Sequence, residues 1–196
     1  MATPVRPQRS SSRPAEILDA AAVLFADRGF HGVSIEDIGR AVGISGPGLY
    51  RHFPGKESVL ARMLLGVSER LVTGGRERVD AAAAPDAALD ALIRGHIEFA
   101  LSEPALITVH DRELGNVPET DRRKVRRLQR SYVEQWVGVL AQLSPELPAA
   151  TLRSATHATF GLLNSTPHSA RAVDRDAMGR MLHGMAHGAL SSVVTG

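Results

Sequence analysis

The chain has 196 residues, of which 43% are hydrophobic and 22% charged, and its formal net charge is +2. It has no cysteine, which excludes disulfide bonds and thiolate metal sites. No apolar run is long enough to span a bilayer, and the N-terminus lacks the hydrophobic segment of a secretory signal. We therefore expect a cytoplasmic protein that makes no membrane contact. The small net charge by itself does not indicate nucleic-acid binding.

Residues 1–12 are rich in Pro, Ser and Arg and contain no acidic residue. This composition predicts a disordered basic arm. Its Arg6 and Arg9, with the following Arg13, would suit the minor groove of DNA, although an inert tail fits equally well.

A first helix is predicted from near Pro14 to Gly29, because glycine commonly ends a helix. Its apolar residues recur at the spacing of one helix face, namely Ile17, Ala21, Leu24 and Phe25.

Two short helices are predicted next. Ser34 and Asp37 have the spacing of a capping box, so a helix should begin after Ser34, and Gly43 should end it. Ser45 then has the form of the next N-cap, with Pro47 in the first turn. Two short helices joined by such a tight turn form a helix-turn-helix, whose second helix enters the major groove of DNA.

Further helices follow from apolar periodicity and proline spacing. A longer helix should start near Lys56, and the pair Gly74-Gly75 before an alanine-rich stretch suggests a loosened connection around 74–85. Later helices are expected at about 86–102, 104–114, 118–143, 147–165 and 174–192. The segment 164–168 interrupts this series, and we give it no chemical interpretation.

No alternating strand pattern and no two-residue hairpin signal occurs in the sequence. We therefore predict an all-α fold. A three-helix DNA-binding domain with the helix-turn-helix should occupy 13–56, and a larger helical bundle should occupy 57–196.

Four segments, in this order and spacing, resemble the DNA-binding domain of the TetR family of transcriptional regulators. They are FADRGF from Phe25, SIEDIG from Ser34, GISGPGLYRHF from Gly43 and GKESVL from Gly55. The resemblance implies a homodimer on a palindromic double-stranded DNA operator, with residues 45–51 of each subunit in one half-site.

By position, the resemblance places operator contacts on Ser34, Ser45, Gly46, Pro47, Gly48, Tyr50, His52 and Lys56. Positions 46 and 48 often carry base-reading side chains in the family, whereas glycine offers no direct readout and weakens a short helix. We expect specificity to depend on Ser45, Tyr50, Arg40, Arg51 and DNA shape. A half-buried packing role for Tyr50 and a solvated Arg51 are the alternatives.

The resemblance also implies that the C-terminal bundle dimerises and binds a small-molecule effector that releases a repressor from DNA. Aromatic side chains with a few polar groups suit a mostly apolar ligand. The residues on helices that usually line such a pocket are His96, Phe99, His110, Tyr132, Trp136, His157, Phe160 and Asn164. For Tyr132, Trp136 and Phe160, plain core packing is the alternative.

The run RRKVRRLQR at 122–130 is unusual, because its arginines lie outside the apolar stripe of the expected helix. They could form a solvated face or hold an anionic headgroup, such as the phosphates of an acyl-CoA. The resemblance makes a fatty-acid-like or acyl-CoA effector plausible, since the family includes regulators that sense such compounds.

Small residues among apolar ones mark the last two long helices and predict a dimer interface built as a four-helix bundle. The small and apolar residues concerned are Ala155, Ala158, Gly161 and Leu162, followed by Met181, Gly184, Met185, Gly188 and Ala189.

The alternative is a helical enzyme or metal-binding protein with a vestigial helix-turn-helix. His183 and His187 stand four residues apart, as metal ligands on one helix face can, but the glutamate of the H-E-x-x-H motif is absent. The sequence has no nucleophile elbow, P-loop or dinucleotide fingerprint. We therefore expect no catalytic residue, no metal site and no cofactor.

Overall fold

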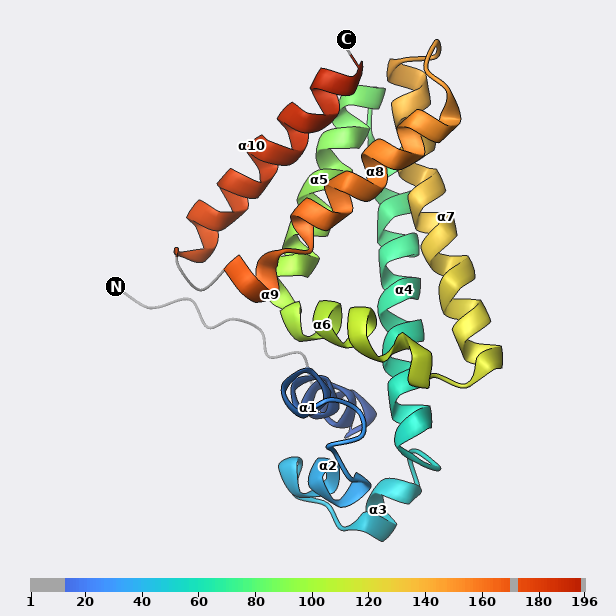
Figure 1. Cartoon of the computed structure of the whole chain (residues 1–196), viewed down its shortest axis with the longest axis vertical. Coiled ribbons are helices and arrows are strands. Elements are labelled where there is room, and N and C mark those ends of the chain that lie inside the picture. Colours follow the sequence, from blue (N-terminus) through green and yellow to red (C-terminus); the bar gives the residue numbers. More distant parts are fainter. Residues whose placement is uncertain (1–12, 170–172, 195–196) are drawn as a thin grey trace.

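The computed structural model describes residues 13–169 and 173–194, and the predicted all-α fold is confirmed over these residues (Figure 1). The basic arm predicted for residues 1–12 lies outside them. The helices are α1 Arg13–Arg28, α2 Ile35–Ala41, α3 Gly46–Tyr50, α4 Lys56–Ala81, α5 Pro85–Ser102, α6 Pro104–Glu113, α7 Glu119–Leu143, α8 Ala149–Leu163, α9 Thr166–Ser169 and α10 Arg175–Val194, with a 3₁₀ turn at Leu114–Asn116.

Helices α1, α2 and α3 form an N-terminal head at one end of the molecule. The predicted capping box is present, since the Asp37 amide donates to the Ser34 hydroxyl and the Ser34 amide donates to the Asp37 carboxylate. Gly29 follows α1 with a φ of 71°, and Gly43 lies in the turn after α2 with a φ of 68°. Both have a left-handed conformation that glycine adopts without strain. The head is therefore ordered by local rules that its sequence carries.

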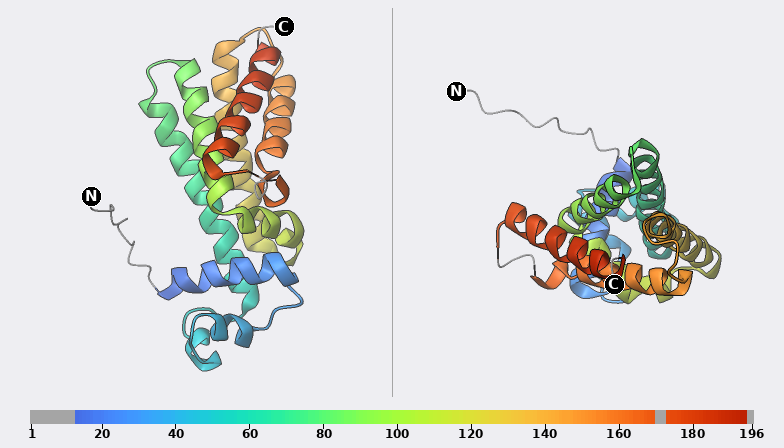
Figure 2. Two further views of the ribbon diagram at one scale, coloured as in Figure 1. Left: turned by 90° about the vertical axis from the view of Figure 1, so that its left-hand side faces the viewer. Right: turned by 90° about the horizontal axis from the view of Figure 1, so that it is seen from above.

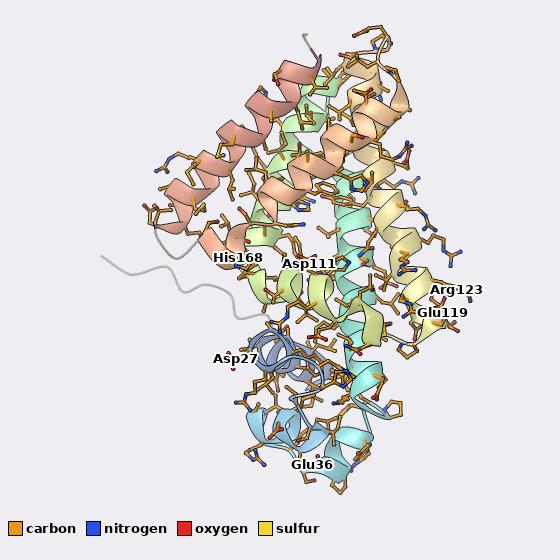
Figure 3. All side chains as sticks on the ribbon, viewed as in Figure 1. Asp27, Glu36, Asp111, Glu119, Arg123 and His168 are labelled. Atoms are coloured by element: carbon orange, nitrogen blue, oxygen red, sulfur yellow. The ribbon has the colours of Figure 1, made fainter. Side chains whose placement is uncertain are left out.

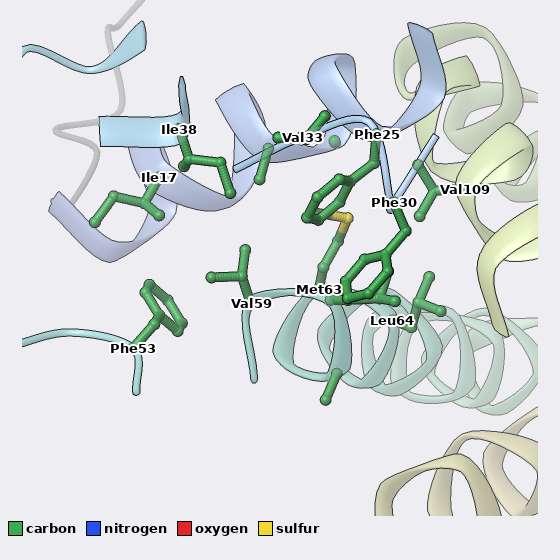
Figure 4. Close-up of a cluster of buried hydrophobic side chains, with 14 of the residues drawn as sticks. Ile17, Phe25, Phe30, Val33, Ile38, Phe53, Val59, Met63, Leu64 and Val109 are labelled. Atoms are coloured by element: carbon green, nitrogen blue, oxygen red, sulfur yellow. The ribbon is translucent and has the colours of Figure 1, made fainter. Parts of the chain in front are cut away.

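The core of the head draws on more than its own three helices (Figure 4). Phe25 and Phe30 pack with their ring centroids 5.4 Å apart, against Met63 of α4 and Val109 of α6. The N-terminal core thus extends beyond residue 56, the predicted end of the first domain.

Helix α4 corrects one prediction. The expected loosened connection around 74–85 is wrong, because α4 continues through Gly74 and Gly75 to Ala81 and the break is confined to residues 82–84. A Cβ added at Gly75 would lie 2.4 Å from Gln135 Oε1 and 2.8 Å from Tyr132 Cε2. Gly75 therefore permits a close approach of α7, and tertiary packing outweighs the weak helix propensity of glycine.

The C-terminal bundle consists of the upper part of α4 with α5, α7, α8 and α10, and α6 crosses between this bundle and the head (Figures 1 and 2). The bundle has its own core, in which Leu92, Trp136, Leu140 and Leu163 are almost fully buried. Helix α8 lies beside α10 on one face of the molecule, and the two views of Figure 2 agree on this.

The uninterpreted segment 164–168 contains the start of α9. Thr166 is buried, and its hydroxyl donates to the Ala100 carbonyl at 2.8 Å, which fastens this turn to α5. In the part of the chain described, no helix combines the length and apolar character needed to cross a membrane.

Candidate DNA interface and effector cavity

The α2–α3 face contains most of the residues predicted to contact DNA. The Ser45 hydroxyl accepts the Gly48 amide at 3.3 Å, and Pro47 occupies the first turn of α3. Leu49 is buried and anchors the helix, whereas Tyr50 is 52% exposed and points away from the core. Arg51 and His52 follow on the surface. Tyr50 does not belong to the buried core of the head, and its contact with DNA stays a prediction.

Ser34 and Arg40 belong to one network around Asp37. The Ser34 hydroxyl donates to Asp37 at 2.7 Å, and an Arg40 guanidinium nitrogen lies 2.9 Å from the same carboxylate. The hydrogen bonds from Ser34 lower the pKa of Asp37 to about 2. The Arg40 side chain remains 76% exposed, so this pair leaves most of it accessible.

Lys56 has partners that the sequence did not indicate. Its Nζ donates to the carbonyl oxygens of Phe30 at 2.9 Å and Val33 at 3.0 Å, and lies 4.4 Å from the Phe30 ring centroid. These bonds tie the start of α4 to the loop between α1 and α2. The DNA contact assigned to Lys56 stays a prediction, and the structure gives this side chain an internal role.

Sequence reasoning missed Glu36, which is exposed in the first turn of α2 (Figure 3). A Cβ at Gly46 would lie 3.8 Å from its carboxylate oxygen, so Glu36 flanks the N-terminal turn of α3. Glu36 stands next to the capping residue Asp37, where an acidic residue is ordinary because acids are favoured at a helix N-terminus. The sequence therefore offered no reason to expect Glu36 on the α2–α3 face.

A cavity of about 260 Å³ lies within the bundle, and we call it the effector cavity. Seven of the eight predicted ligand residues line it: His96, Phe99, His110, Tyr132, His157, Phe160 and Asn164. Trp136 does not line it. Trp136 is fully buried behind the cavity wall, with its ring edge-on to Phe160 at 5.0 Å.

The buried end of the effector cavity contains a chain of hydrogen bonds. His96 Nε2 lies 3.0 Å from Asn164 Oδ1, and His96 Nδ1 lies 3.3 Å from the Tyr132 hydroxyl. Because an amide oxygen only accepts, Nε2 carries the imidazole hydrogen and Nδ1 accepts from Tyr132. Burial lowers the pKa of His96 to about 4 and raises that of Tyr132 to about 12, so both groups are neutral near pH 7.

Aromatic rings stack around this chain. The His96 ring is nearly parallel to Phe160 at 4.7 Å and to Tyr132 at 5.8 Å. The rings come from α5, α7 and α8, so the tertiary fold brings them together. The plain-core alternative describes Trp136, whereas Tyr132 and Phe160 serve both as core and as cavity wall.

The outer end of the cavity is more polar and more exposed. His110 contacts Gln129, and its other ring nitrogen lies 3.2 Å from Asp111, whose side chain is 64% exposed. His157 is also exposed. Sequence reasoning missed the wall from α4, formed by Val67, Ser68 and Leu71, because Val67 and Leu71 have the spacing of an ordinary core-facing helix stripe.

The arginine run lies on the outer face of α7, away from the bundle core, where Figure 3 labels Arg123. Arg123 pairs with Glu119 at 2.8 Å, while no ion pair with a described residue is seen for Arg126, Arg127 or Arg130. These four arginines line an open surface groove. Binding of an anionic group there stays a prediction.

The outer face of α10 is apolar where the sequence predicted a dimer interface. Met181 and Met185 are 47% and 50% exposed, and a Cβ at Gly184 or Gly188 would meet nothing within 4 Å. On the inner side of α10, His183 Nε2 lies 2.6 Å from the Asp90 carboxylate of α5. No group of three or more His, Cys, Asp or Glu suited to a metal forms within 13–169 and 173–194.

Residues 17–63 match the family described as bacterial regulatory proteins, tetR family, and residues 82–168 match the tetracyclin repressor-like C-terminal domain. The chain is 33% identical over 131 residues to the HTH-type transcriptional repressor KstR2 of Rhodococcus jostii, covering 66% of this chain and 64% of that protein. It therefore spans slightly less than two thirds of this relative's length.

Solved structures share the fold over nearly the whole chain. A TetR-family regulator from Bordetella parapertussis superposes with a TM-score of 0.79 at 26% identity, covering 88% of this chain and 93% of the other. The TetR-family regulator PfmR of Thermus thermophilus gives 0.77 at 23% identity, covering 90% and 96%. With both of its parts matched in order, the chain belongs to the TetR family of bacterial regulatory proteins.

Proposed function

We propose that this protein is a ligand-responsive transcriptional repressor. In this proposal it binds a palindromic operator as a homodimer in the cytoplasm, and a small, mostly apolar effector releases it. Its similarity to a protein named as a transcriptional repressor supports this. So does a helix-turn-helix face in a chain that also contains a cavity.

The observation that carries the proposal is the position of α6, which contacts both the cavity and the head. Ile107, His110 and Asp111 of α6 line the effector cavity. In the last turn of the same helix, the Arg112 guanidinium donates to the Ala26 carbonyl at 3.3 Å and the buried Glu113 packs beside Gly29. A ligand that displaces α6 therefore acts on α1.

This coupling requires that the ligand bind one conformation better than the other. Shifting a two-state equilibrium from 1:99 to 99:1 requires about 10⁴-fold preferential binding, or about 5.5 kcal/mol. A helix packed against both sites provides the differential contacts, because close-packed interfaces rearrange between discrete states.

Dimerisation through α8 and α10 fits the exposed apolar face described above. Two copies of this helix pair would form a four-helix bundle about a two-fold axis, which suits a palindromic operator. Each subunit then offers one α3 to one half-site, and the half-site spacing depends on how the two heads are held.

We assign base and phosphate recognition to the exposed α2–α3 face, with Tyr50 as its principal side chain. The test is a gel shift on DNA upstream of the coding region, over a range of salt concentrations. Tyr50→Ala should weaken the selective shift about tenfold or more, because it removes the largest exposed side chain of α3. Val23→Ala, an exposed change on α1, should leave it unaltered. Absence of any salt-sensitive, sequence-selective shift would contradict the proposal and favour the enzyme or metal-protein alternative.

A second possibility concerns the effector's outer end. The four-arginine groove suits phosphate groups, but it lies on the outer face of α7 and shares no residue with the cavity, so an effector would have to pass around α7 to use both. Isothermal titration with acyl-CoAs against the matched free acids tests it. Equal affinity for both would remove any role for the groove.

A further inference from the structure

We propose that the buried end of the effector cavity binds a neutral oxygen acceptor, such as a ketone or amide carbonyl, through the side-chain amide of Asn164. The ligand would be a ring compound of about two fused rings, and carboxylates would be excluded from this end. This inference rests on the proposed function, since it names the class of effector for the same cavity.

Several hydrogen-bond donors at this end of the cavity are already bonded within the protein. The Tyr132 hydroxyl donates its hydrogen bond to His96 Nδ1, and His96 Nε2 donates to Asn164 Oδ1. The Ser68 hydroxyl donates to the Leu64 carbonyl at 2.7 Å. Among the described residues, no partner is seen for the two Asn164 Nδ2 hydrogens, and Asn164 lines the cavity. The cavity therefore offers a ligand two free donors at this point.

The cavity lining carries little charge. Among the described residues, no lysine or arginine lines the cavity, and the one lining carboxylate, Asp111, is largely exposed at the outer end. His96 is neutral in this site, because burial disfavours its charged form. A carboxylate at the buried end would have no counter-charge, and a buried unpaired ion is strongly unfavourable. A neutral acceptor meets the two amide donors without that penalty.

The volume of the cavity and its aromatic walls limit the size and shape of the ligand. A dry cavity of about 150 Å³ is known to hold one benzene molecule, so about 260 Å³ accommodates a larger ring system. The walls are mostly apolar, and the stacked rings of Tyr132, His96 and Phe160 present flat surfaces. A rigid bicyclic compound fills such a space with little loss of conformational freedom.

The experiment uses four probes of one skeleton: 1-tetralone, tetralin, 1-aminotetralin and the carboxylate of tetralin-1-carboxylic acid. Dissociation constants are measured on the full chain by ligand-observed NMR, with thermal shift as a second readout. We expect tetralone and tetralin to bind, and the carboxylate to bind at least tenfold more weakly than tetralone. A carboxylate that binds as well as the ketone, or failure of all four probes to bind, would overturn the proposal.

Two variants test the role of Asn164. Asn164→Leu should weaken tetralone about fivefold to tenfold and leave tetralin unchanged, because only the ketone loses a hydrogen bond. Asn164→Asp keeps an acceptor for His96 but removes the amide donors, so it should weaken the ketone and strengthen 1-aminotetralin. Gln142→Leu, at an exposed amide on α7 outside the cavity lining, is the control and should keep the wild-type order. Equal losses for tetralone and tetralin in Asn164→Leu would show a merely structural role.

The readouts separate the two proposals. Probe binding is measured without DNA, so it stands if the chain never shifts an operator. If instead the chain binds DNA selectively but shows no preference for the neutral probe, the repressor proposal survives and the ligand class is wrong.

Discussion

Lys56 illustrates, at the scale of single residues, how a side chain in a DNA-binding motif can have an internal role. It donates to two backbone carbonyls from the loop that precedes α2. A sequence motif gives the position of such a residue but not its partners. The same holds for His96, whose polar ring lies in an apolar bundle only because Tyr132 and Asn164 satisfy both of its nitrogens.

We expect Lys56→Met to lower the free energy of unfolding by about 1–3 kcal/mol, because two partly buried carbonyls lose their donor. Urea unfolding measures this. Lys124→Met is the matched control, since Lys124 makes an exposed i,i+3 pair with Asp121 and should change stability by less than about 1 kcal/mol. Unchanged stability with weaker DNA binding would instead support the phosphate contact predicted from the sequence.

His96 should make stability depend on pH. Its pKa is about 4 in the folded chain and near 6.5 when unfolded, so between these values the unfolded chain binds the extra proton. Stability therefore falls as pH drops from about 6.5 to 4, by at most about 1.4 kcal/mol per pH unit. Urea unfolding at pH 7 and pH 5 should show a larger difference for the wild type than for His96→Gln. Equal differences would rule out this contribution.

At the scale of elements, α4 decides how the molecule is connected. It starts in the head, forms one wall of the effector cavity and passes against α7 at Gly75. A pair of glycines in a sequence usually predicts a break in a helix, because glycine has a low helix propensity. Here Gly75 is needed for the space that α7 occupies, and that need is visible only once both helices are in place.

Gly75→Ala should destabilise the protein by about 1–3 kcal/mol, because its methyl group overlaps Gln135 and Tyr132. Displacing Tyr132 should also weaken probe binding in the effector cavity. Gly66→Ala in the same helix is the control, since nothing lies within 4 Å of the added methyl. It should be neutral or stabilise by about 1 kcal/mol. Similar thermal unfolding of the two variants would refute the close approach.

At the scale of the whole molecule, the exposed face of α8 and α10 lies on the bundle, at the opposite end from the α2–α3 face (Figures 1 and 2). A dimer joined there would hold two heads on the same side. Small residues on both helices allow the close approach that such a four-helix bundle requires.

The double substitution Met181→Asp and Met185→Asp should convert the proposed dimer to a monomer, because it places four like charges across a two-fold interface. Sedimentation velocity measures the change. Val23→Asp introduces a charge at another exposed apolar residue, on α1, and should leave the dimer intact. A wild-type chain that sediments as a monomer, or a double variant that remains dimeric, would show that this face is not the interface.

The sequence by itself determined the helix-turn-helix, because its caps, glycines and turn are local and each depends on neighbouring residues such as Ser34 with Asp37. It also determined the all-α class and most helix ends, through periodicity and proline. It named seven of the residues that line the effector cavity, guided by a resemblance. Only the tertiary structure decided that α4 is continuous, that Trp136 lies behind the cavity wall and that Lys56 bonds inward. These outcomes depend on contacts between segments that are distant in the sequence. The way one helix packs against another leaves no local signal in the sequence of either helix.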